Sequence, residues 1–323
     1  MSGLAVVTGA SGFVGRAFAG ELKRRGWEVR GIDVRPGPDV VAVGDITHAG
    51  VWTSALRGAD LVVHAAAIVT ESGAPATFWR VNVEGTTTVL AEAGKAGVGR
   101  VLHLSTTVVH GTDFRDGVDE TGPVRMTGNP YTDTKVAAEH QALLAHAAGV
   151  VPVTVIRPGD VYGPHSQPWT VRPVQLMRRN LFVLVDGGAG ILSPTFVTDV
   201  VAGGLAAATH PTGVGQVFHL TGGQAVTARD FFAHYADMLG KSMRSLPSTA
   251  ARAVTAPVDF ISRNLGWQPP LHPRAVEYLT HPGTYSIAKA ERVLGWTPAV
   301  PLAEGMERTR AWLVDTGLLP RRR

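Results

Sequence analysis

The sequence predicts an α/β protein with a doubly wound parallel sheet and a smaller, mostly helical lobe toward the C-terminus. Through the first half of the chain, short apolar runs alternate with helical patterns, as strands and crossover helices do in βαβ units. After Arg157 this alternation gives way to Pro-rich segments and isolated helices. We therefore expect a sheet-based domain formed by residues 1–163 and 194–221, and a second lobe formed by residues 164–193 and 222–323.

The expected strands are short runs rich in Val, Leu and Ile. Strands of a parallel sheet are buried on both faces, so such runs lack the polar alternation of a half-exposed strand. In chain order they are Leu4–Thr8, Glu28–Asp33, Val40–Val43, Leu61–His64, Arg100–Ser105 and Val153–Arg157, with a return to the sheet at Gln216–Leu220. Helix-like spacing of apolar residues between them predicts helices at Val14–Arg25, Gly50–Leu56, Pro75–Ala96 and Tyr131–Ala148.

Composition narrows the class of protein. With 323 residues, 45% hydrophobic and 17% charged, the chain can bury a large core and is globular. Without cysteine it has no disulfide, thiolate metal site or cysteine nucleophile, and we expect no metal. Basic residues are scattered and no nucleic-acid module is recognisable, so nucleic acid is not an expected partner. The N-terminus lacks a basic leader, and the apolar stretch 181–208 is interrupted, so we expect a cytoplasmic protein without a membrane span.

A glycine-rich loop follows the first predicted strand and opens a helix. Its glycines are Gly9, Gly12 and Gly15, in a G-x-x-G-x-x-G pattern. The first permits a tight turn, the second lets a phosphate approach the backbone, and the third allows close packing of helix on strand. A dinucleotide pyrophosphate would lie on the helix N-terminus, beside Ser11, Phe13 and Val14. The loop therefore predicts a Rossmann-type dinucleotide site.

The end of the second predicted strand indicates which dinucleotide binds. Asp33 lies there, where a carboxylate accepts hydrogen bonds from the adenosine ribose hydroxyls. A carboxylate also repels a 2′-phosphate, which favours NAD as the cofactor. Arg35 nearby offers a positive charge to such a phosphate, so NADP remains the alternative.

Residues 128–135 read GNPYTDTK and place Tyr131 four residues before Lys135. This spacing puts both side chains on one face of a helix. The pair is either a proton-transfer site or a surface pair at a helix start. So short a motif does not decide between these interpretations by itself.

The order of the other motifs favours the proton-transfer site. Along the chain they are VTGASGFVG (7–15), GD (44–45), HAAA (64–67), NVEGT (82–86), LSTTVVHG (104–111), PYTDTK (130–135), IRPGDVYGP (156–164) and KAERVLGWTP (289–298). With this ordered set, the sequence resembles the extended short-chain dehydrogenase/reductase family, the NAD-dependent epimerase/dehydratase family, over nearly its whole length. Its C-terminal region resembles the 3β-hydroxysteroid dehydrogenase/ketoreductase branch.

The resemblance implies a catalytic set of Thr106, Tyr131 and Lys135. Tyr131 would give or take a proton, Thr106 would donate a hydrogen bond to the substrate oxygen, and Lys135 would stabilise the phenolate and bind the nicotinamide ribose. The other implied cofactor contacts are Asp45, Ile46, Ala65, Ala66, Ala67, Asn82, Ser105, Pro158 and Val161, besides Tyr131 and Lys135. One departure is His110, where the family usually has tyrosine; we expect a packing role for it.

Single residues separate the branches of this family. The nucleotide-sugar dehydratases carry Asp-Glu after the catalytic Thr, whereas this chain has Thr107-Val108. At the positions where 4-epimerases contact the nucleotide, an asparagine is replaced by Asp160 and a phosphate-binding arginine by Leu192. Arg274 lies close enough in sequence to the second phosphate arginine of the epimerases to keep that branch open.

We therefore expect an NAD(P)-dependent alcohol dehydrogenase or ketoreductase with a largely apolar, steroid-like or polyketide-like substrate. Trp169, Phe260 and Trp267 are candidate pocket walls, although each would serve equally well in the core. The alternatives are an NAD-dependent nucleotide-sugar 4-epimerase and a non-catalytic, cofactor-sensing protein, which would not need the intact Tyr131/Lys135 pair. Small and apolar residues on the Tyr131 helix also predict a homodimer.

Overall fold

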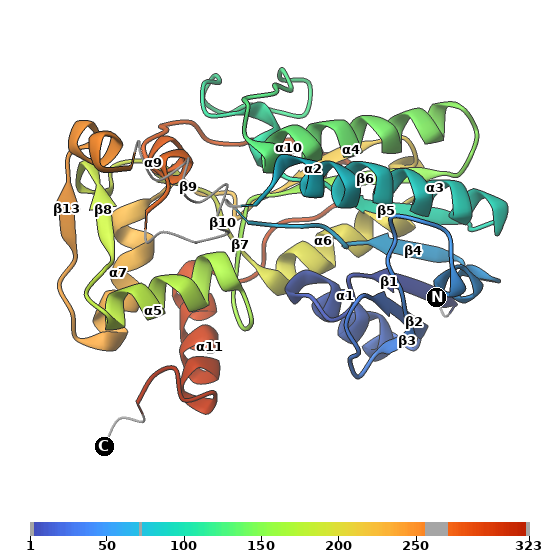
Figure 1. The fold of residues 1–323 in the computed structure, drawn as a ribbon, viewed down its shortest axis with the longest axis horizontal. Coiled ribbons are helices and arrows are strands. Elements are labelled where there is room, and N and C mark those ends of the chain that lie inside the picture. Colours follow the sequence, from blue (N-terminus) through green and yellow to red (C-terminus); the bar gives the residue numbers. More distant parts are fainter. Residues whose placement is uncertain (1–2, 71–72, 256–270, 321–323) are drawn as a thin grey trace.

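A seven-stranded parallel sheet forms the centre of the molecule, which is described by a computed structural model for residues 3–70, 73–255 and 271–320 (Figure 1). The strand order is β11-β6-β5-β4-β1-β2-β3, so the order reverses between β1 and β4. Such a switch point marks the ligand crevice of open α/β sheets. The strands are β1 (Leu4–Thr8), β2 (Glu28–Asp33), β3 (Val40–Val43), β4 (Leu61–His64), β5 (Arg100–Leu104), β6 (Val153–Pro158) and β11 (Val217–Leu220). The predicted fold class is confirmed.

Two predicted helices differ in kind from the expectation. The segment expected as a helix at Gly50–Leu56 is the 3₁₀ helix η1 (Val51–Leu56), in which the Thr53 and Ser54 hydroxyls donate back to the carbonyls of Gly50 and Val51. Such local bonds compete with the regular α-helical ladder.

The long helix expected at Pro75–Ala96 is interrupted in the middle. It consists of α2 (Pro75–Phe78), the π-helical turn η2 (Trp79–Glu84) and α3 (Gly85–Lys95). π-helical turns are rare and are often found at functional sites. Here the turn contains the buried Asn82.

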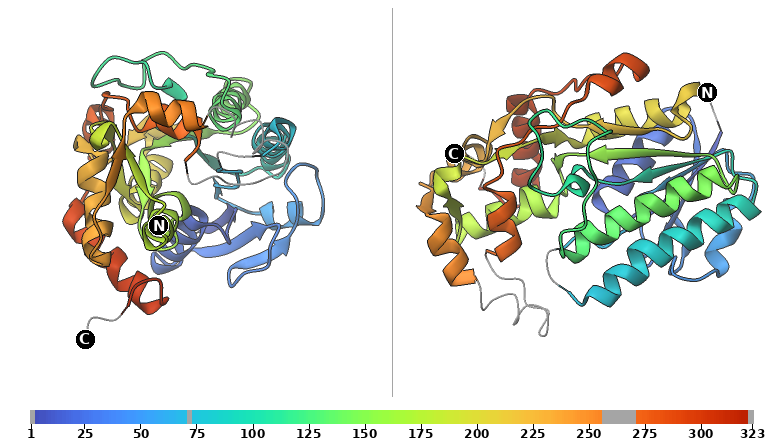
Figure 2. Two further views of the ribbon diagram at one scale, coloured as in Figure 1. Left: turned by 60° about the vertical axis from the view of Figure 1, so that its left-hand side comes forward. Right: turned by 90° about the horizontal axis from the view of Figure 1, so that it is seen from above.

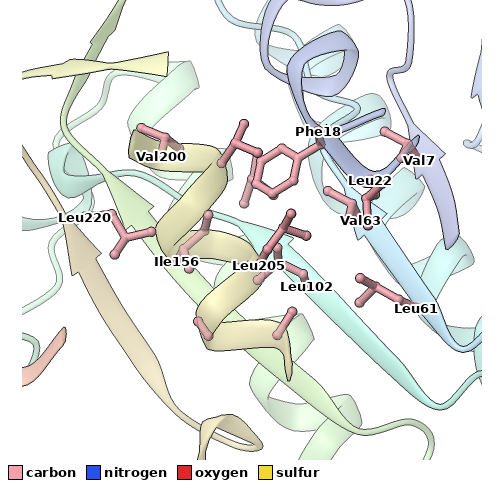
Figure 3. Close-up of a cluster of buried hydrophobic side chains, with 14 of the residues drawn as sticks. Val7, Phe18, Leu22, Leu61, Val63, Leu102, Ile156, Val200, Leu205 and Leu220 are labelled. Atoms are coloured by element: carbon pink, nitrogen blue, oxygen red, sulfur yellow. The ribbon is translucent and has the colours of Figure 1, made fainter. Parts of the chain in front are cut away.

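Helices cover both faces of the sheet. On one face, α1 (Phe13–Arg24), α6 (Val197–Thr209) and α10 (Ala288–Leu294) enclose a large apolar core, in which Phe18 lies against α6 (Figure 3). A Cβ at Gly204 would lie 2.7 Å from Phe18 Cζ, so this glycine allows α6 to approach α1 closely. The second face is covered by η1, α3 and α4 (Pro130–Ala147), around a core that includes Trp52 and Val101.

The C-terminal lobe lies beside the carboxyl ends of the sheet strands (Figures 1 and 2). The pairs β12–β9 and β13–β8 and several helices build it around its own core of aromatic and aliphatic side chains, and a third pair, β10–β7, lies where it joins the sheet-based domain. No helix within the described ranges has the length and apolar character needed to cross a membrane. The elements of this region are β7 (Asp160–Tyr162), η4 (Gln167–Val171), α5 (Arg172–Arg178), β8 (Val183–Val185), η5 (Asp186–Gly188), β9 (Ile191–Leu192), β10 (Pro194–Phe196), β12 (Val226–Thr227), α7 (Ala228–Leu239), β13 (Arg244–Leu246), α9 (Pro273–Tyr278) and α11 (Leu302–Asp315).

Candidate active site

The glycine loop forms a tight cradle between β1 and α1. Gly9 has a φ of 71°, and a Cβ on it would lie 2.8 Å from the backbone of Ala66. A Cβ on Gly15 would lie 2.2 Å from the Gly9 carbonyl oxygen, so the helix approaches the loop as closely as the sequence predicted. Helix α1 begins after Gly12 without a side-chain cap. Its first amide groups therefore suit an anion such as a pyrophosphate.

Asp33 lies at the end of β2 with its carboxylate next to this cradle. One oxygen accepts from the Ser11 amide at 3.0 Å and the other from the Arg35 amide at 3.0 Å. The Arg35 guanidinium is largely exposed, and its Nε lies 3.9 Å from the same carboxylate. The structure thus brings Asp33 to the glycine loop, where a ribose would follow the pyrophosphate, and places an exposed positive charge beside it.

The other predicted cofactor residues line the carboxyl ends of the neighbouring strands. Ala65, Ala66 and Ala67 follow β4 and are half-buried. Asp45 is exposed, and hydrogen bonds from the Thr47 backbone lower the pKa of its carboxyl. Ile46 is buried and packs against Gly85, where a Cβ would lie 2.9 Å from its Cδ1. A dinucleotide that lies across these strand ends fits the cradle, because the glycines leave room for it and Asp33 offers its carboxylate.

Asn82 holds the loop after β4 rather than facing outward. Its Oδ1 accepts from the Ile68 amide at 2.7 Å, and its Nδ2 donates to the Ile68 carbonyl and to Thr134 Oγ1. The Thr86 hydroxyl in turn donates to the Asn82 carbonyl. Asn82, the predicted cofactor anchor, therefore ties the loop after β4 to α4 and has a supporting role.

A buried chain of hydrogen bonds continues from Thr86 to the glycine strand. His64 Nε2 lies 2.9 Å from Thr86 Oγ1, and His64 Nδ1 lies 2.7 Å from Thr8 Oγ1. Thr86 donates its proton to Asn82, so it accepts from Nε2, and Nδ1 accepts from Thr8. Both bonds are thus satisfied by the neutral ring. Burial lowers the pKa of His64 to about 3 and keeps it neutral.

Thr106, Tyr131 and Lys135 meet at the carboxyl end of β5. Thr106 is the N-cap residue of a short 3₁₀ turn, η3 (Thr107–His110), and its hydroxyl accepts from the Val108 amide at 3.3 Å. Burial raises the pKa of Tyr131 to about 12, while a hydrogen bond with the Thr106 side chain acts in the opposite direction. The tyrosine is therefore a protonated phenol at neutral pH, ready to act as an acid.

Lys135 lies one helical turn behind Tyr131 and is buried. Its Nζ donates to the Leu104 carbonyl at the end of β5. Burial lowers the pKa of Lys135 to about 8, and the nearby Glu139 carboxylate opposes this shift. The ammonium group remains mostly charged at pH 7 and can stabilise a phenolate one turn away.

Sequence reasoning missed a buried ion pair behind this set. Arg157 on β6 binds Glu139 on α4 through Nε–Oε2 at 3.0 Å and Nη2–Oε1 at 2.5 Å. The Ser105 hydroxyl donates to Glu139 Oε2 at 2.5 Å, so its proton is used within the protein. The available signal was Arg157, a charged residue at the end of the otherwise apolar strand pattern of β6. Pro158 and Val161 follow Arg157, with Pro158 buried and Val161 half-buried.

On the substrate side of the site, side chains contact other groups of the protein. Asp160 is buried, and its carboxylate accepts from Tyr278 Oη at 2.6 Å and from the Ser193 amide at 2.8 Å. Burial raises its pKa to about 6. Leu192 is fully buried in the core of the lobe. The ring centroids of Trp169 and Tyr278 lie 6.0 Å apart.

Two predicted pocket walls, Phe260 and Trp267, lie outside the described residues. His110 packs against its neighbours as expected, but it also makes polar contacts that the sequence did not indicate.

Known proteins resemble this chain in sequence and in fold. The profile of the family described as NAD dependent epimerase/dehydratase matches residues 5–220. The chain is 32% identical to a 4-hydroxy-2-methyl-3-oxo-4-farnesyl-3,4-dihydroquinoline-1-oxide ketoreductase of Stigmatella aurantiaca, over 98% of both chains. It is also 32% identical to a 3 beta-hydroxysteroid dehydrogenase/Delta 5→4-isomerase of Mycobacterium tuberculosis, over 92% of this chain and 86% of the relative. Among solved structures, MoeE5 in complex with UDP-glucose and NAD has a TM-score of 0.78 at 25% identity, covering 97% of this chain and 99% of that one.

Proposed function

Since this chain belongs to the NAD-dependent epimerase/dehydratase family and is an NAD(P)-dependent oxidoreductase of the extended short-chain type, we propose that it acts as an alcohol dehydrogenase or ketoreductase on a largely apolar, steroid-like or polyketide-like substrate. One observation carries this proposal. A complete Thr106–Tyr131–Lys135 set lies beside a substrate lobe in which Leu192 is buried in the core, and the Asp160 carboxylate next to this lobe is bonded internally. Neither residue offers a positive or hydrogen-donating group to a nucleotide phosphate.

The cofactor of the proposed enzyme is NAD. Gly9, Gly12 and Gly15 would let the pyrophosphate reach the start of α1, and Asp33 would accept from the adenosine ribose. The solved structure of MoeE5 contains NAD, which supports this choice. Arg35 is the residue through which NADP would be accommodated. When bound, the nicotinamide supplies or receives the hydride.

The side chains supply the proton and orient the reacting oxygen. In the direction of reduction, Tyr131 donates its phenolic proton to the substrate carbonyl oxygen as that oxygen gains negative charge. Thr106 donates a hydrogen bond to the same oxygen and holds it near the phenol. Lys135 stabilises the phenolate that remains, because its ammonium group lies one helical turn away. In the direction of oxidation each proton moves the opposite way.

A nucleotide-sugar 4-epimerase is the second candidate. The observation in its favour is the likeness to MoeE5, whose structure contains UDP-glucose. The sequence relatives at higher identity are named as a ketoreductase and a hydroxysteroid dehydrogenase, which favours the first candidate. A purely cofactor-sensing protein is disfavoured by the buried Lys135, since a sensor would gain nothing from a buried cation behind a tyrosine.

We also propose the two-domain organisation that the sequence predicted. Residues 1–163 and 194–221 would bind the cofactor, and residues 164–193 and 222–323 would bind the substrate. A homodimer through α3 and α4 is supported by Leu144 on α4, whose side chain is 47% exposed. Light scattering would detect such a dimer directly.

A substrate panel tests the proposed function. Hydroxysteroids, β-keto esters and UDP-sugars would each be incubated with the protein and NAD or NADH, with the Tyr131→Phe variant as the background control. We expect a change in NADH absorbance with at least one steroid or β-keto ester. Conversion of a UDP-sugar into its epimer, with no net change in NADH, would instead establish the epimerase.

A further inference from the structure

The Arg157–Glu139 ion pair is the most deeply buried charged contact described in the structure. Both residues are 3% exposed, and the guanidinium binds both carboxylate oxygens. Breaking a buried pair of this kind leaves an uncompensated charge inside the protein, so both partners are strongly held in place. The pair joins β6 to α4, one helical turn beyond Lys135.

The same ion pair holds both ends of the segment that contains Thr106. Ser105, immediately before it, donates to Glu139 Oε2 at 2.5 Å. His110 lies at the end of η3, and its Nε2 accepts a hydrogen bond from Arg157 Nη1 at 3.2 Å. Thr106 itself has an extended backbone and caps η3. It is therefore held between two residues that are each fixed to the same pair.

The protonation of His110 follows from its partners. Its Nδ1 lies 2.9 Å from the Pro123 carbonyl oxygen, which can only accept, so Nδ1 carries the proton. Its Nε2 is then a lone-pair acceptor for Arg157, whose guanidinium can only donate. The ring is completely buried. A neutral histidine thus satisfies both contacts through its two ring nitrogens.

His110 also connects this segment to the C-terminal part of the chain. The His219 ring on β11 packs edge-on against the His110 ring, with centroids 5.1 Å apart, and its Nδ1 lies 3.2 Å from the Ser286 carbonyl oxygen. Its backbone amide donates to Glu120 at 2.7 Å. Three distant segments therefore meet behind the η3 turn.

We propose that His110, together with the Arg157–Glu139 pair, is a positioning residue for Thr106. It holds η3 so that the Thr106 hydroxyl faces the Tyr131 phenol and the substrate oxygen. This inference rests on the proposed function for the role of Thr106, but the geometry that it describes can be measured separately. Small displacements of a donor matter, because a shift of about 1 Å can cost about 10²-fold in rate.

Two substitutions at His110 test the proposal. His110→Leu keeps the approximate volume and removes the hydrogen bonds with Pro123 and Arg157, whereas His110→Gln can still accept from Arg157 and donate to Pro123. His140→Leu is the matched control, since His140 lies on the exposed face of α4. For each variant, hydrogen–deuterium exchange of the 104–111 peptide, the Kd for NADH and the kcat with the best ketone of the panel would be measured.

We expect faster exchange of the 104–111 peptide in His110→Leu and wild-type exchange in His110→Gln and His140→Leu. We expect kcat to fall by about tenfold or more in His110→Leu, with the KM for the ketone and the Kd for NADH within about twofold of wild type. If His110→Leu does not fold, Ser105→Ala releases the other end of the segment and should raise the exchange of the same peptide.

Unchanged exchange and unchanged kcat in His110→Leu would overturn the proposal. Equal losses in His110→Leu and His110→Gln would also overturn it, because only volume would then matter. If the wild-type protein reduces no ketone, the proposed function fails, and the exchange measurement alone still decides whether His110 holds the segment.

Discussion

The sheet-based domain and the C-terminal lobe use their polar groups at the carboxyl edge of the sheet differently. In the first, the glycine cradle and Asp33 lie at strand ends, where a cofactor can reach them. Where the sheet-based domain meets the lobe, the Asp160 carboxylate bonds to Tyr278 and Ser193 of the lobe, and Leu192 is part of the lobe's core. Under the proposed function, this difference means that the sheet-based domain carries the reaction chemistry, while the lobe selects the substrate.

Acid should destabilise the protein through two buried histidines of the sheet-based domain. His64 and His219 have pKa values of about 3 in the folded protein because they are buried, against about 6.5 when unfolded. Between these values the unfolded chain binds more protons, so stability is full above pH 6.5 and falls as the pH decreases. At pH 4.5 the two residues together should cost about 5 kcal/mol of unfolding free energy.

Urea titrations at several pH values measure this effect. In His64→Gln, the amide can accept from Thr8 and donate to Thr86 without titrating, so the loss between pH 6.5 and 4.5 should be smaller by about 2–3 kcal/mol. The exposed His140→Gln should keep the wild-type slope. An equal slope in His64→Gln and wild type would show that His64 is not held neutral.

Removing the phenol should stop the chemistry without disturbing the cofactor. Tyr131→Phe should lower turnover by about 10²-fold or more, the scale of a lost general acid. Thr106→Val should reduce turnover less, because it removes a hydrogen bond rather than the proton. The Kd for NADH, measured by fluorescence, should stay near wild type in both. Wild-type turnover in Tyr131→Phe would contradict the mechanism.

Alanine substitutions at two glycines test how α1 packs on α6. Gly204→Ala would place a Cβ 2.7 Å from Phe18 Cζ and 3.1 Å from Ile156 Cδ1, so it should lower the unfolding free energy by about 1–3 kcal/mol. Gly20→Ala, on the exposed face of α1, has no atom within 4 Å of its new Cβ and should raise stability by about 0.5–1 kcal/mol. Thermal unfolding that moves in the same direction for both would contradict this packing.

The smallest expected effect is on cofactor choice. Asp33→Gly removes a ribose acceptor and the repulsion of a 2′-phosphate, so NADH binding should weaken by about tenfold while NADPH binding gains in relative terms. Asp39→Asn neutralises a carboxylate that pairs with Lys23 and should change neither. Tighter NADPH than NADH binding by the wild-type protein would reverse the assignment.

Local patterns sufficed for the sheet-based domain because its signals are short in sequence. The strands, the glycine loop and the Tyr131/Lys135 spacing each lie within a few consecutive residues. The π-helical turn around Asn82 was not predictable, since helical spacing does not reveal one inserted residue. The contacts of Asp160 with Tyr278, and of His110 with His219, join segments more than 100 residues apart. No local pattern encodes such pairs.

Binding of UDP-sugars tests the central claim most directly. Isothermal titration and thermal shift would compare UDP-glucose, UDP and an apolar ketone such as a ketosteroid, each with the NAD-loaded protein. The account predicts that UDP and UDP-glucose at millimolar concentration neither bind to the protein nor stabilise it, whereas the ketone does at least one. The reason is that position 192 carries a leucine instead of a phosphate-binding arginine, and that Asp160 adds negative charge. A UDP-sugar bound at micromolar affinity would contradict the account and establish a nucleotide-sugar enzyme in its place.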